Sequence, residues 1–412
     1  MAKKITWYQT AQYIALLLVA VALPVSWRYA LWAAVLLVAM SVVNIAVSRR
    51  LSIVPLRGTA VGPFLIVLYW LVLLATMLYS HDAVAGWEVL WRKAVLLIFP
   101  LGFMLTDNRW LDMRRMRGVA YAFLVSQVGV FAYYTVVAVG KVSSGGTVAS
   151  AFGTAFNPDH HAYIALYVTV ALAFVYHELH THWGELPVWK RVLMIATVPM
   201  LIFYVVIVNS RAGMLSLYFL IVVCPLHFAL TRRRWWQALL MMTLLGGFTF
   251  GVEKTLPGHQ PRVAQTIEDV AGDAPTDARV KIYGSGVSAA LERPIFGYGV
   301  GDYRRHLTQQ YADDAFDSGV SSHYNAHNQY VESMLAAGVL GLSTLVAMLL
   351  WPLHMAWRRR SKALCLIFLL TCVIAFNLLC ESMLERQMGL LFIGPILVIM
   401  SLVVRQEEKK FC

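Results

Sequence analysis

The chain has 412 residues, of which 59% are hydrophobic and 14% charged, and its 34 basic against 22 acidic residues give a formal net charge of +12. This composition excludes an ordinary soluble protein and indicates a membrane protein that crosses the bilayer many times. The basic residues cluster at the ends of apolar stretches, which is typical of membrane topology signals and not of nucleic-acid binding. We therefore expect membrane lipids, and no nucleic acid, among its partners.

Apolar stretches about as long as a bilayer is thick recur along the chain. Because backbone polar groups in lipid must pair within their own segment, each stretch predicts a transmembrane helix. The expected fold class is therefore an all-α polytopic membrane protein. Its transmembrane helices, about twelve in number by this length criterion, are predicted at residues 10–26, 30–47, 61–80, 89–106, 118–140, 160–178, 191–209, 212–230, 236–252, 328–356, 363–380 and 387–404.

A long polar loop separates the ninth predicted transmembrane helix from the tenth. The chain accordingly divides into transmembrane helices 1–9 over residues 1–252, the loop over residues 253–327, and transmembrane helices 10–12 with a cytoplasmic tail over residues 328–412. Lysine and arginine clusters lie at alternate ends of the spans. Their placement predicts that both termini are cytoplasmic and that the long loop is periplasmic.

The long loop carries helix and turn signals of its own. The spacing of apolar residues predicts a short interfacial helix from Asp277 to Leu291 and a second from Asp302 to Tyr311. Between them, Gly297-Tyr298-Gly299-Val300-Gly301 is too rich in glycine for a regular element and predicts a turn. We expect this loop to be ordered and to lie over the helices as an interfacial lid.

One arginine stands in an apolar run, Val208-Asn209-Ser210-Arg211-Ala212-Gly213, between the seventh and eighth predicted helices. A charge within a membrane is expensive, and such residues usually mark a substrate or ion path. The alternative is that Arg211 extends to lipid headgroups at the interface. The tight turn favours the first interpretation, because it holds the guanidinium in one direction.

A second arginine, Arg279, lies early in the first predicted loop helix, between Asp277 and Lys281. On its own it resembles a solvated surface residue. A guanidinium nevertheless matches phosphate oxygens with two parallel hydrogen bonds, which a lysine cannot form. Arg211 and Arg279 are therefore candidates to bind the two phosphates of a diphosphate together.

The loop ends in a histidine-containing stretch at the start of the tenth predicted helix. His327 is the candidate catalytic residue, because an imidazole accepts a proton near neutral pH, as a general base must. The alternative is a helix-capping or interfacial histidine, and His323 is a rival that lies farther from the predicted membrane surface. Asn328 and Glu332 are supporting candidates; Glu332 is expected either to orient a histidine or to be a buried, paired carboxylate. Gly338 is expected at a close-packing position.

Other polar clusters carry weaker signals. His160 and His161 point different ways on a helix and make a poor metal pair. Asp313, Asp314 and Asp317 resemble the carboxylates of metal-dependent sugar transferases, but we interpret them as a solvated helix end. The five cysteines form no CxxC pair. Neither a metal site nor a cofactor is therefore expected.

At these positions the chain resembles the O-antigen ligase family, membrane enzymes that join O-polysaccharide to lipid A–core. The resemblance covers most of the chain and rests on the twelve-helix pattern, the long loop before the tenth helix and four short motifs. These motifs are Asn209-Ser210-Arg211-Ala212-Gly213, Asp277-Ala278-Arg279, Pro294-Ile295-Phe296-Gly297-Tyr298-Gly299, and His327-Asn328 followed after nine residues by Gly338-Val339-Leu340-Gly341.

The resemblance implies a fold similar to the GT-C membrane glycosyltransferases, a place in the bacterial inner membrane and an active site that faces the periplasm. It implies an undecaprenyl-diphosphate-linked O-antigen as donor and lipid A–core as acceptor, without a metal ion. Carried over by motif, Arg211 and Arg279 bind the donor diphosphate and His327 acts on the acceptor. We expect the transfer to invert the anomeric centre.

Two other functions fit parts of the sequence. An O-antigen polymerase or a protein O-oligosaccharyltransferase uses the same kind of donor with another acceptor, and these relatives share the serine–arginine turn and the glycine-rich element. A flippase for lipid-linked sugars is less favoured, because transporters tend to carry broken helices and internal repeats, and neither is clear in this sequence.

Overall fold

The computed structural model of this chain describes residues 6–48, 60–106, 108–145, 147–155, 161–256 and 278–408. Throughout these ranges the regular structure is helical and no strand occurs. Within them, ten helices are long and apolar enough to cross a membrane, and two shorter apolar helices, Val95–Met104 and Leu364–Cys380, accompany them. The predicted class, an all-α polytopic membrane protein, is confirmed.

The chain divides into two compact units. Unit 1 comprises Met1–Ala122, Gly272–Ile367 and Leu378–Cys412, and unit 2 comprises Phe123–Ala271 and Phe368–Asn377. Helix α6 (Met113–Ser143) begins in unit 1 and continues in unit 2.

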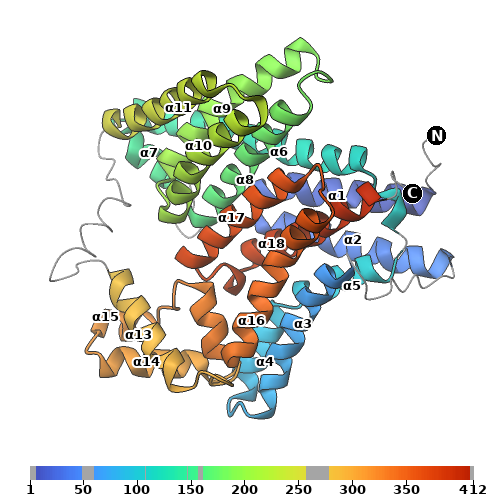
Figure 1. The fold of residues 1–412 in the computed structure, drawn as a ribbon. Helices are drawn as coiled ribbons and strands as arrows, with labels where there is room; N and C mark the ends of the chain where they lie inside the picture. Colours follow the sequence, from blue (N-terminus) through green and yellow to red (C-terminus); the bar gives the residue numbers. More distant parts are fainter. Residues whose placement is uncertain are drawn as a thin grey trace. The chain divides into compact units, whose positions relative to one another are not determined.

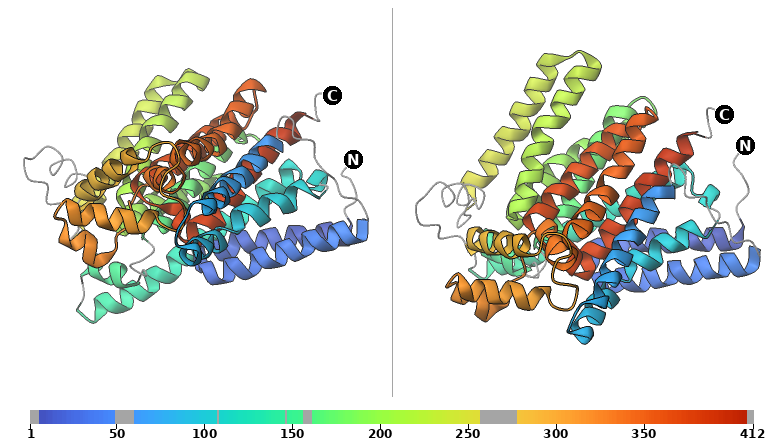
Figure 2. Two further views of the ribbon diagram at one scale, coloured as in Figure 1. Left: turned by 90° about the horizontal axis from the view of Figure 1, so that it is seen from below. Right: turned by 60° about the horizontal axis from the view of Figure 1, so that its bottom comes forward.

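Unit 1 contains most of the N-terminal and C-terminal helices together with the loop helices. Two long antiparallel helices, α1 and α2, lie side by side (Figure 2), and α3 packs against α5, α16 and α18. The loop helices gather beside α16 (Figure 1). The bounds are α1 Trp7–Val25, α2 Trp27–Ser48, α3 Val61–Ala75, α4 Ala83–Arg92, α5 Val95–Met104, α13 Ala278–Glu292, α14 Tyr303–Asp313, α15 Asp317–Ser322, α16 Gln329–Arg358 and α18 Gln387–Glu408, with short 3-10 turns at Thr76–Leu78, Asn108–Trp110 and Met383–Glu385.

Unit 2 is built around α8, which is buried on nearly every side. An apolar helix with no polar face packs stably only when other helices surround it, and α9 and α10 both pack against α8. Helices α10 and α11 run side by side (Figure 2). The bounds are α7 Val148–Ala155, α8 His161–Thr181, α9 Val188–Val208, α10 Arg211–Arg232 and α11 Trp235–Thr255, and the middle of α17 (Leu364–Cys380) also belongs to this unit.

The predicted transmembrane helix at 89–106 is wrong as a single element. The structure has two helices of ten residues there, α4 and α5, separated at Lys93 and Ala94. Lys93 is 2% exposed and pairs with the carboxylate of Glu385. A buried ammonium requires such a partner, and the sequence reasoning placed this lysine inside an apolar span without one.

The helices predicted in the long loop are present. The first is described from Ala278 onward, and Asp277 lies outside the described residues. The second starts one residue later than expected, at Tyr303. A third short helix, α15, was not expected. The part of the loop at residues 257–277 also lies outside the described residues. Residues 278–327 thus contain the predicted helices, and the role of the loop as an interfacial lid stays a prediction.

Helix α16 is interrupted close to its start, which the prediction of a continuous helix at 328–356 missed. The backbone leaves the helical region at Ala337 (φ −142°, ψ 19°) and Gly338 (φ 58°, ψ −151°). The second conformation is essentially restricted to glycine. A β-carbon at Gly338 would also lie 2.2 Å from the carbonyl oxygen of Ile295. The expected close-packing role of Gly338 is therefore confirmed.

The glycine-rich turn fills this break. Two of its backbone amides donate to carbonyl groups of α16 just before the break, and one amide of α16 just after the break donates to a residue that precedes the turn. These hydrogen bonds pair buried backbone groups at the break. The three hydrogen bonds run from Tyr298 N to Leu335 O (2.8 Å), from Gly299 N to Ala336 O (3.1 Å) and from Val339 N to Pro294 O (2.8 Å). The turn and the start of α16 thus form one hydrogen-bonded structure.

Candidate functional site

The backbone of His327 is held in an unusual conformation. Its φ of 45° lies in the left-handed region, which costs a residue with a side chain roughly 1–2 kcal/mol. Asn328 follows as the N-cap of α16, and its side-chain oxygen accepts from the amides of Tyr330 at 2.9 Å and Val331 at 3.2 Å. Asn328 therefore acts as a helix cap that places His327 immediately before the first turn of α16.

Three further contacts fix the same backbone. The amide of Ala326 donates to Glu332 Oε1 at 3.1 Å, and the amide of His327 donates to the side chain of Asn325 at 3.1 Å. The hydroxyl of Tyr283 donates to the carbonyl of His327 at 3.3 Å. Strained conformations persist only where surrounding contacts determine them. The fully buried Glu332 thus supports the chain beside His327 and does not contact its imidazole.

The imidazole itself meets a carboxylate that the sequence reasoning did not single out. His327 Nδ1 lies 2.8 Å from Glu381 Oε1. The other oxygen of Glu381 lies 3.5 Å from Nη2 of Arg279, whose Nη1 donates to the carbonyl of Cys380 at 3.1 Å. The three side chains are 16–25% exposed, so they are accessible but largely shielded from water. The structure thus brings two of the predicted site residues, Arg279 and His327, to one carboxylate.

The charge of Glu381 determines which nitrogen of His327 carries hydrogen. Burial would raise the pKa of Glu381, but the hydrogen bond and charge of His327 together with Arg279 outweigh burial, and the pKa is lowered. An ionised carboxylate only accepts hydrogen bonds, so Nδ1 of His327 must donate to it. In the neutral imidazole Nε2 then bears the lone pair. The pair therefore has the tautomer that a general base requires.

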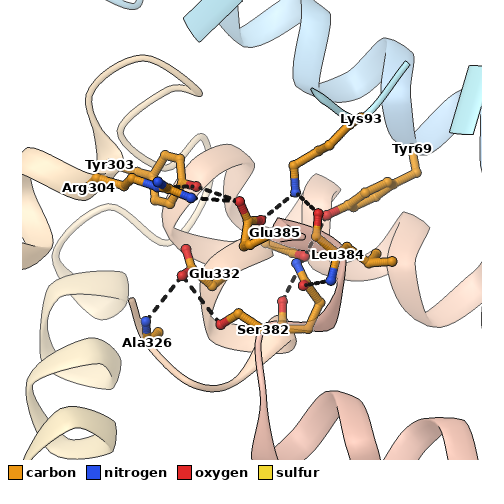
Figure 3. Close-up of polar contacts among 11 residues, drawn as sticks. Tyr69, Lys93, Tyr303, Arg304, Ala326, Glu332, Ser382, Leu384 and Glu385 are labelled. Carbon is orange, nitrogen blue, oxygen red and sulfur yellow. Dashed lines mark hydrogen bonds and ion pairs between the residues drawn. The ribbon is translucent and has the colours of Figure 1, made fainter. Parts of the chain in front are cut away.

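A buried ion-pair network lies at the other end of the same connection, residues 381–386 (Figure 3). Glu385 accepts from Lys93, from Nη2 of Arg304 at 3.0 Å and from the hydroxyl of Tyr303 at 3.2 Å. Burial would raise the pKa of Glu385, but the charges of Lys93 and Arg304 hold this pKa well below its usual value. Two cations thus compensate one carboxylate that is almost fully buried.

Additional hydrogen bonds connect the residues 381–386 to α16 and to Lys93, which lies between α4 and α5 (Figure 3). The hydroxyl of Ser382 lies 3.4 Å from Glu332 Oε1, and the amide of Leu384 donates to the side chain of Gln329 at 2.7 Å. Lys93 Nζ also donates to the carbonyl of Leu384 at 3.0 Å. The connection 381–386 is therefore fixed from both sides, which fixes the position of Glu381.

Arg211 belongs to unit 2 and stands at the start of α10. Helix α9 ends at Val208, Asn209 has a left-handed backbone (φ 50°), Ser210 is the N-cap, and Arg211 is the first helical residue. The expected tight turn between two helices is confirmed. Further along the motif, a β-carbon at Gly213 would lie 2.4 Å from that of Ala165, so this glycine allows α10 to approach α8 closely. The role of Arg211 in binding the donor diphosphate stays a prediction.

The remaining candidates lie outside these networks. His323 is exposed and is the C-cap of α15, with a left-handed backbone (φ 48°). Asp313, Asp314 and Asp317 are exposed, so their interpretation as a solvated helix end is confirmed; Asp314 accepts from Ser285 at 2.5 Å. His161 begins α8, whereas His160 lies outside the described residues.

Sequence reasoning missed the residues that complete the site. Glu381 and Glu385 lie in the six-residue connection between the last two apolar spans, and Lys93 lies inside a run predicted to be a span. The sequence did offer one indication. Acidic residues in a connection this short are buried by the flanking helices, and a buried carboxylate requires a cation as partner. Arg304 belongs to no motif in the sequence, and only the tertiary structure places it beside Glu385.

The fold and site define a polytopic helical membrane protein that gathers an imidazole, a carboxylate and a guanidinium at the start of one helix. Residues 195–346 match the family model described as O-antigen ligase. The resemblance to the O-antigen ligase family is thereby confirmed, and the matched segment covers less than half of the chain. The matched region includes Arg211, Arg279 and His327, while Glu381 follows it.

A second comparison covers a shorter segment. Over 104 residues the chain is 26% identical to an uncharacterized protein of Haemophilus influenzae, a match that covers 25% of this chain and 26% of that protein. The chain therefore matches only about a quarter of that relative's length.

Proposed function

We propose that this protein is a glycosyltransferase of the bacterial inner membrane that transfers O-antigen from undecaprenyl diphosphate to a sugar hydroxyl of lipid A–core. The observation that carries the proposal is the His327–Glu381–Arg279 cluster, in which a base, its orienting carboxylate and a phosphate-binding cation meet. The family match supports the reaction class, and the orientation expected from the basic residues puts the cluster on the periplasmic side.

His327 acts as the general base in this proposal. Glu381 holds Nδ1, so Nε2 accepts the proton of the acceptor hydroxyl as its oxygen attacks the anomeric carbon of the donor. Glu381 stabilises the imidazolium that forms, because opposite charges at 2.8 Å attract strongly in a partly dehydrated site. The acceptor oxygen thereby becomes a better nucleophile at the moment it attacks.

Arg279 and Arg211 bind the diphosphate in this proposal. Guanidinium groups form paired hydrogen bonds with phosphate oxygens and retain their charge at any physiological pH. The Arg279 contacts with Glu381 and Cys380 hold the plane of its guanidinium, so little reorganisation is needed when charge develops on the leaving group.

The proposed step is a single displacement. The bond between the anomeric carbon and the diphosphate oxygen breaks, and undecaprenyl diphosphate leaves with the electron pair. The acceptor oxygen forms the new glycosidic bond from the opposite face, and its proton passes to Nε2 of His327. The anomeric centre is inverted. The proton is then released to water, which restores the neutral imidazole.

Reconstitution of the purified protein in liposomes tests this function. Donor is supplied with lipid A–core, with a second lipid-linked glycan, with an acceptor peptide or alone, and release of undecaprenyl diphosphate is followed. We expect release that requires lipid A–core. Release with the second lipid-linked glycan would instead indicate a polymerase, and release with peptide a protein O-oligosaccharyltransferase. Movement of donor between leaflets without release would indicate a flippase and overturn the proposal.

A further inference from the structure

A second polar cluster lies in unit 2, at the end of α8. It consists of His177 and Glu178 on the last turns of the helix and His182 just beyond its end. His177 is 7% exposed and Glu178 is fully buried, while the side chain of His182 is 19% exposed. We name these three residues the α8 cluster. Imidazole and carboxylate groups are costly to bury in a largely apolar helical unit unless they are paired or coordinate a metal ion.

The spacing of the α8 cluster suits a small cation. One donor atom from each residue lies within 4.8 Å of the other two. Between His182 Nδ1 and Glu178 Oε1 the distance is 3.4 Å. Ligands bound at about 2.0–2.1 Å in a tetrahedral site stand roughly 3.4 Å apart, so this pair already has the separation of two ligands. The third donor, a ring nitrogen of His177, lies within 4.8 Å of the other two, and Nδ1 of this ring also lies 3.4 Å from the hydroxyl of Thr181.

We propose that His177, Glu178 and His182 bind a divalent transition-metal ion, with Zn²⁺ as the best match. Two imidazoles and one carboxylate form a donor set that Zn²⁺ commonly uses, whereas Mg²⁺ and Ca²⁺ prefer oxygen ligands alone. The fourth position is left for water or an additional ligand.

The neighbouring histidines serve other contacts and are not assigned to the metal. His227 Nδ1 lies 2.6 Å from the hydroxyl of Tyr176, and His180 Nε2 lies 3.3 Å from the hydroxyl of Thr231. Nη2 of Arg232 donates to the carbonyl of His180 at 2.7 Å, which places a fixed positive charge beside that residue. A cation is therefore less favourable at His180 than at Glu178, and His180 serves as a matched control.

The proposed ion joins the α8–α9 connection to α8, because His182 is in the connection and the other two ligands are on the helix. It lies far from Arg211 within the same unit. The hydrogen bond between Tyr176 and His227 pairs this end of α8 with the far end of α10. Arg211 precedes His227 by sixteen residues of α10, which is about 24 Å along a helix. The α8 cluster is thus a stabilising site that is independent of the proposed transfer.

Metal titration of the full chain tests the assignment. Protein purified through a tag without histidine is stripped with chelator and titrated with Co²⁺, whose visible absorption reports a tetrahedral site, and then with Zn²⁺. We expect one Co²⁺ per chain, displaced by Zn²⁺, and a higher melting temperature with Zn²⁺ than after chelation. His182→Ala should weaken binding by more than the roughly 10–100-fold that follows loss of a residue supporting a ligand.

The variants separate the possible results. His180→Ala should bind like the wild type, and His177→Gln provides a second ligand variant if His182→Ala does not fold. Equal Co²⁺ binding by the wild type and both ligand variants would mean an adventitious ion only and would overturn the proposal. Loss of binding on His180→Ala with retention on His182→Ala would overturn the assignment of the ligands.

Discussion

Glu381 and His327, 54 positions apart in the chain, meet with Oε1 and Nδ1 at 2.8 Å. This contact joins the connection before α18 to the residue that precedes the N-cap of α16. It gives His327 a defined ring orientation and a defined tautomer, and it places Arg279 on the other oxygen of the same carboxylate. Each of these consequences is open to experiment.

Replacing Glu381 with glutamine should slow transfer. The amide preserves the shape of the side chain but removes the charge that stabilises the imidazolium. General acid–base catalysis contributes about 10²–10⁴-fold, so we expect His327→Ala to lose that factor and Glu381→Gln to lose a part of it. The losses of activity in both variants are measured from initial rates of undecaprenyl diphosphate release. Asp313→Asn, at an exposed carboxylate, is the control and should leave the rate unchanged; a normal rate for Glu381→Gln would contradict the proposed dyad.

Replacing Arg279 with alanine should reduce turnover by about 10²–10³-fold, the usual cost of removing one group that stabilises a developing charge. Arg279→Lys should recover only part of this loss, because lysine keeps the charge without the two-pronged geometry. Arg305, whose side chain is 67% exposed, gives a matched control in Arg305→Lys. Identical kinetics for Arg279→Ala and the wild type would exclude Arg279 from donor binding.

Breaking the buried pair of Lys93 and Glu385 should destabilise the protein. Removing one partner leaves a buried charge without compensation, which costs about 3–5 kcal/mol. Lys93→Met should therefore lower the melting temperature of the detergent-purified protein. In the double variant Lys93→Met with Glu385→Gln, no buried charge is left unpaired at these two positions, so part of the loss should be recovered. Strictly additive effects would show that the two groups are not coupled.

The acid stability of the protein should reflect Glu381. Its pKa in the folded protein lies below the ordinary value of 4.5, so its contribution to stability is present above that value and is lost as the pH falls through the lower folded pKa. The difference in melting temperature between wild type and Glu381→Gln should thus persist as the pH falls to about 4.5 and shrink below that value. A difference that already fell between pH 8 and 6 would contradict the lowered pKa.

Gly338→Ala should be severely destabilising. The substitution introduces a β-carbon 2.2 Å from the Ile295 carbonyl oxygen and forces alanine into a conformation that costs of order 1–3 kcal/mol even without the clash. Gly284 in α13 is the matched control, because it is exposed and a β-carbon added there would have no other heavy atom within 4 Å. Gly284→Ala should stabilise by about 0.5–1 kcal/mol. Thermal unfolding of both variants distinguishes local strain from a general intolerance of substitution.

Features encoded by neighbouring residues could be predicted from the sequence. The turn before Arg211 and the glycine-rich turn at 297–301 depend on residues next to one another, and the spans follow from apolar length. The break in α16 was missed because Ala337-Gly338 alone is compatible with a helix. It becomes favourable only when the distant turn donates hydrogen bonds to the carbonyls beside it.

Pairs of residues that only the tertiary structure brings together could not be predicted from the sequence. Lys93 and Glu385 are separated by 292 positions, and neither belongs to a motif. Glu332, a plausible partner for His327 at helical spacing, instead binds the amide of Ala326. Residue type and spacing thus identified the imidazole and a guanidinium, whereas the carboxylate between them depends on how the last two helices return to α16.

The interruption of α16 has a mechanical consequence. The two turns that follow the Asn328 cap hydrogen-bond to Tyr298 and Gly299, and Val339 on the far side of the break hydrogen-bonds to Pro294. The bend at Ala337 and Gly338 is therefore held on both sides, and it cannot straighten unless these hydrogen bonds open. The position of the cap, and with it that of His327, depends on loop residues that are distant in the sequence.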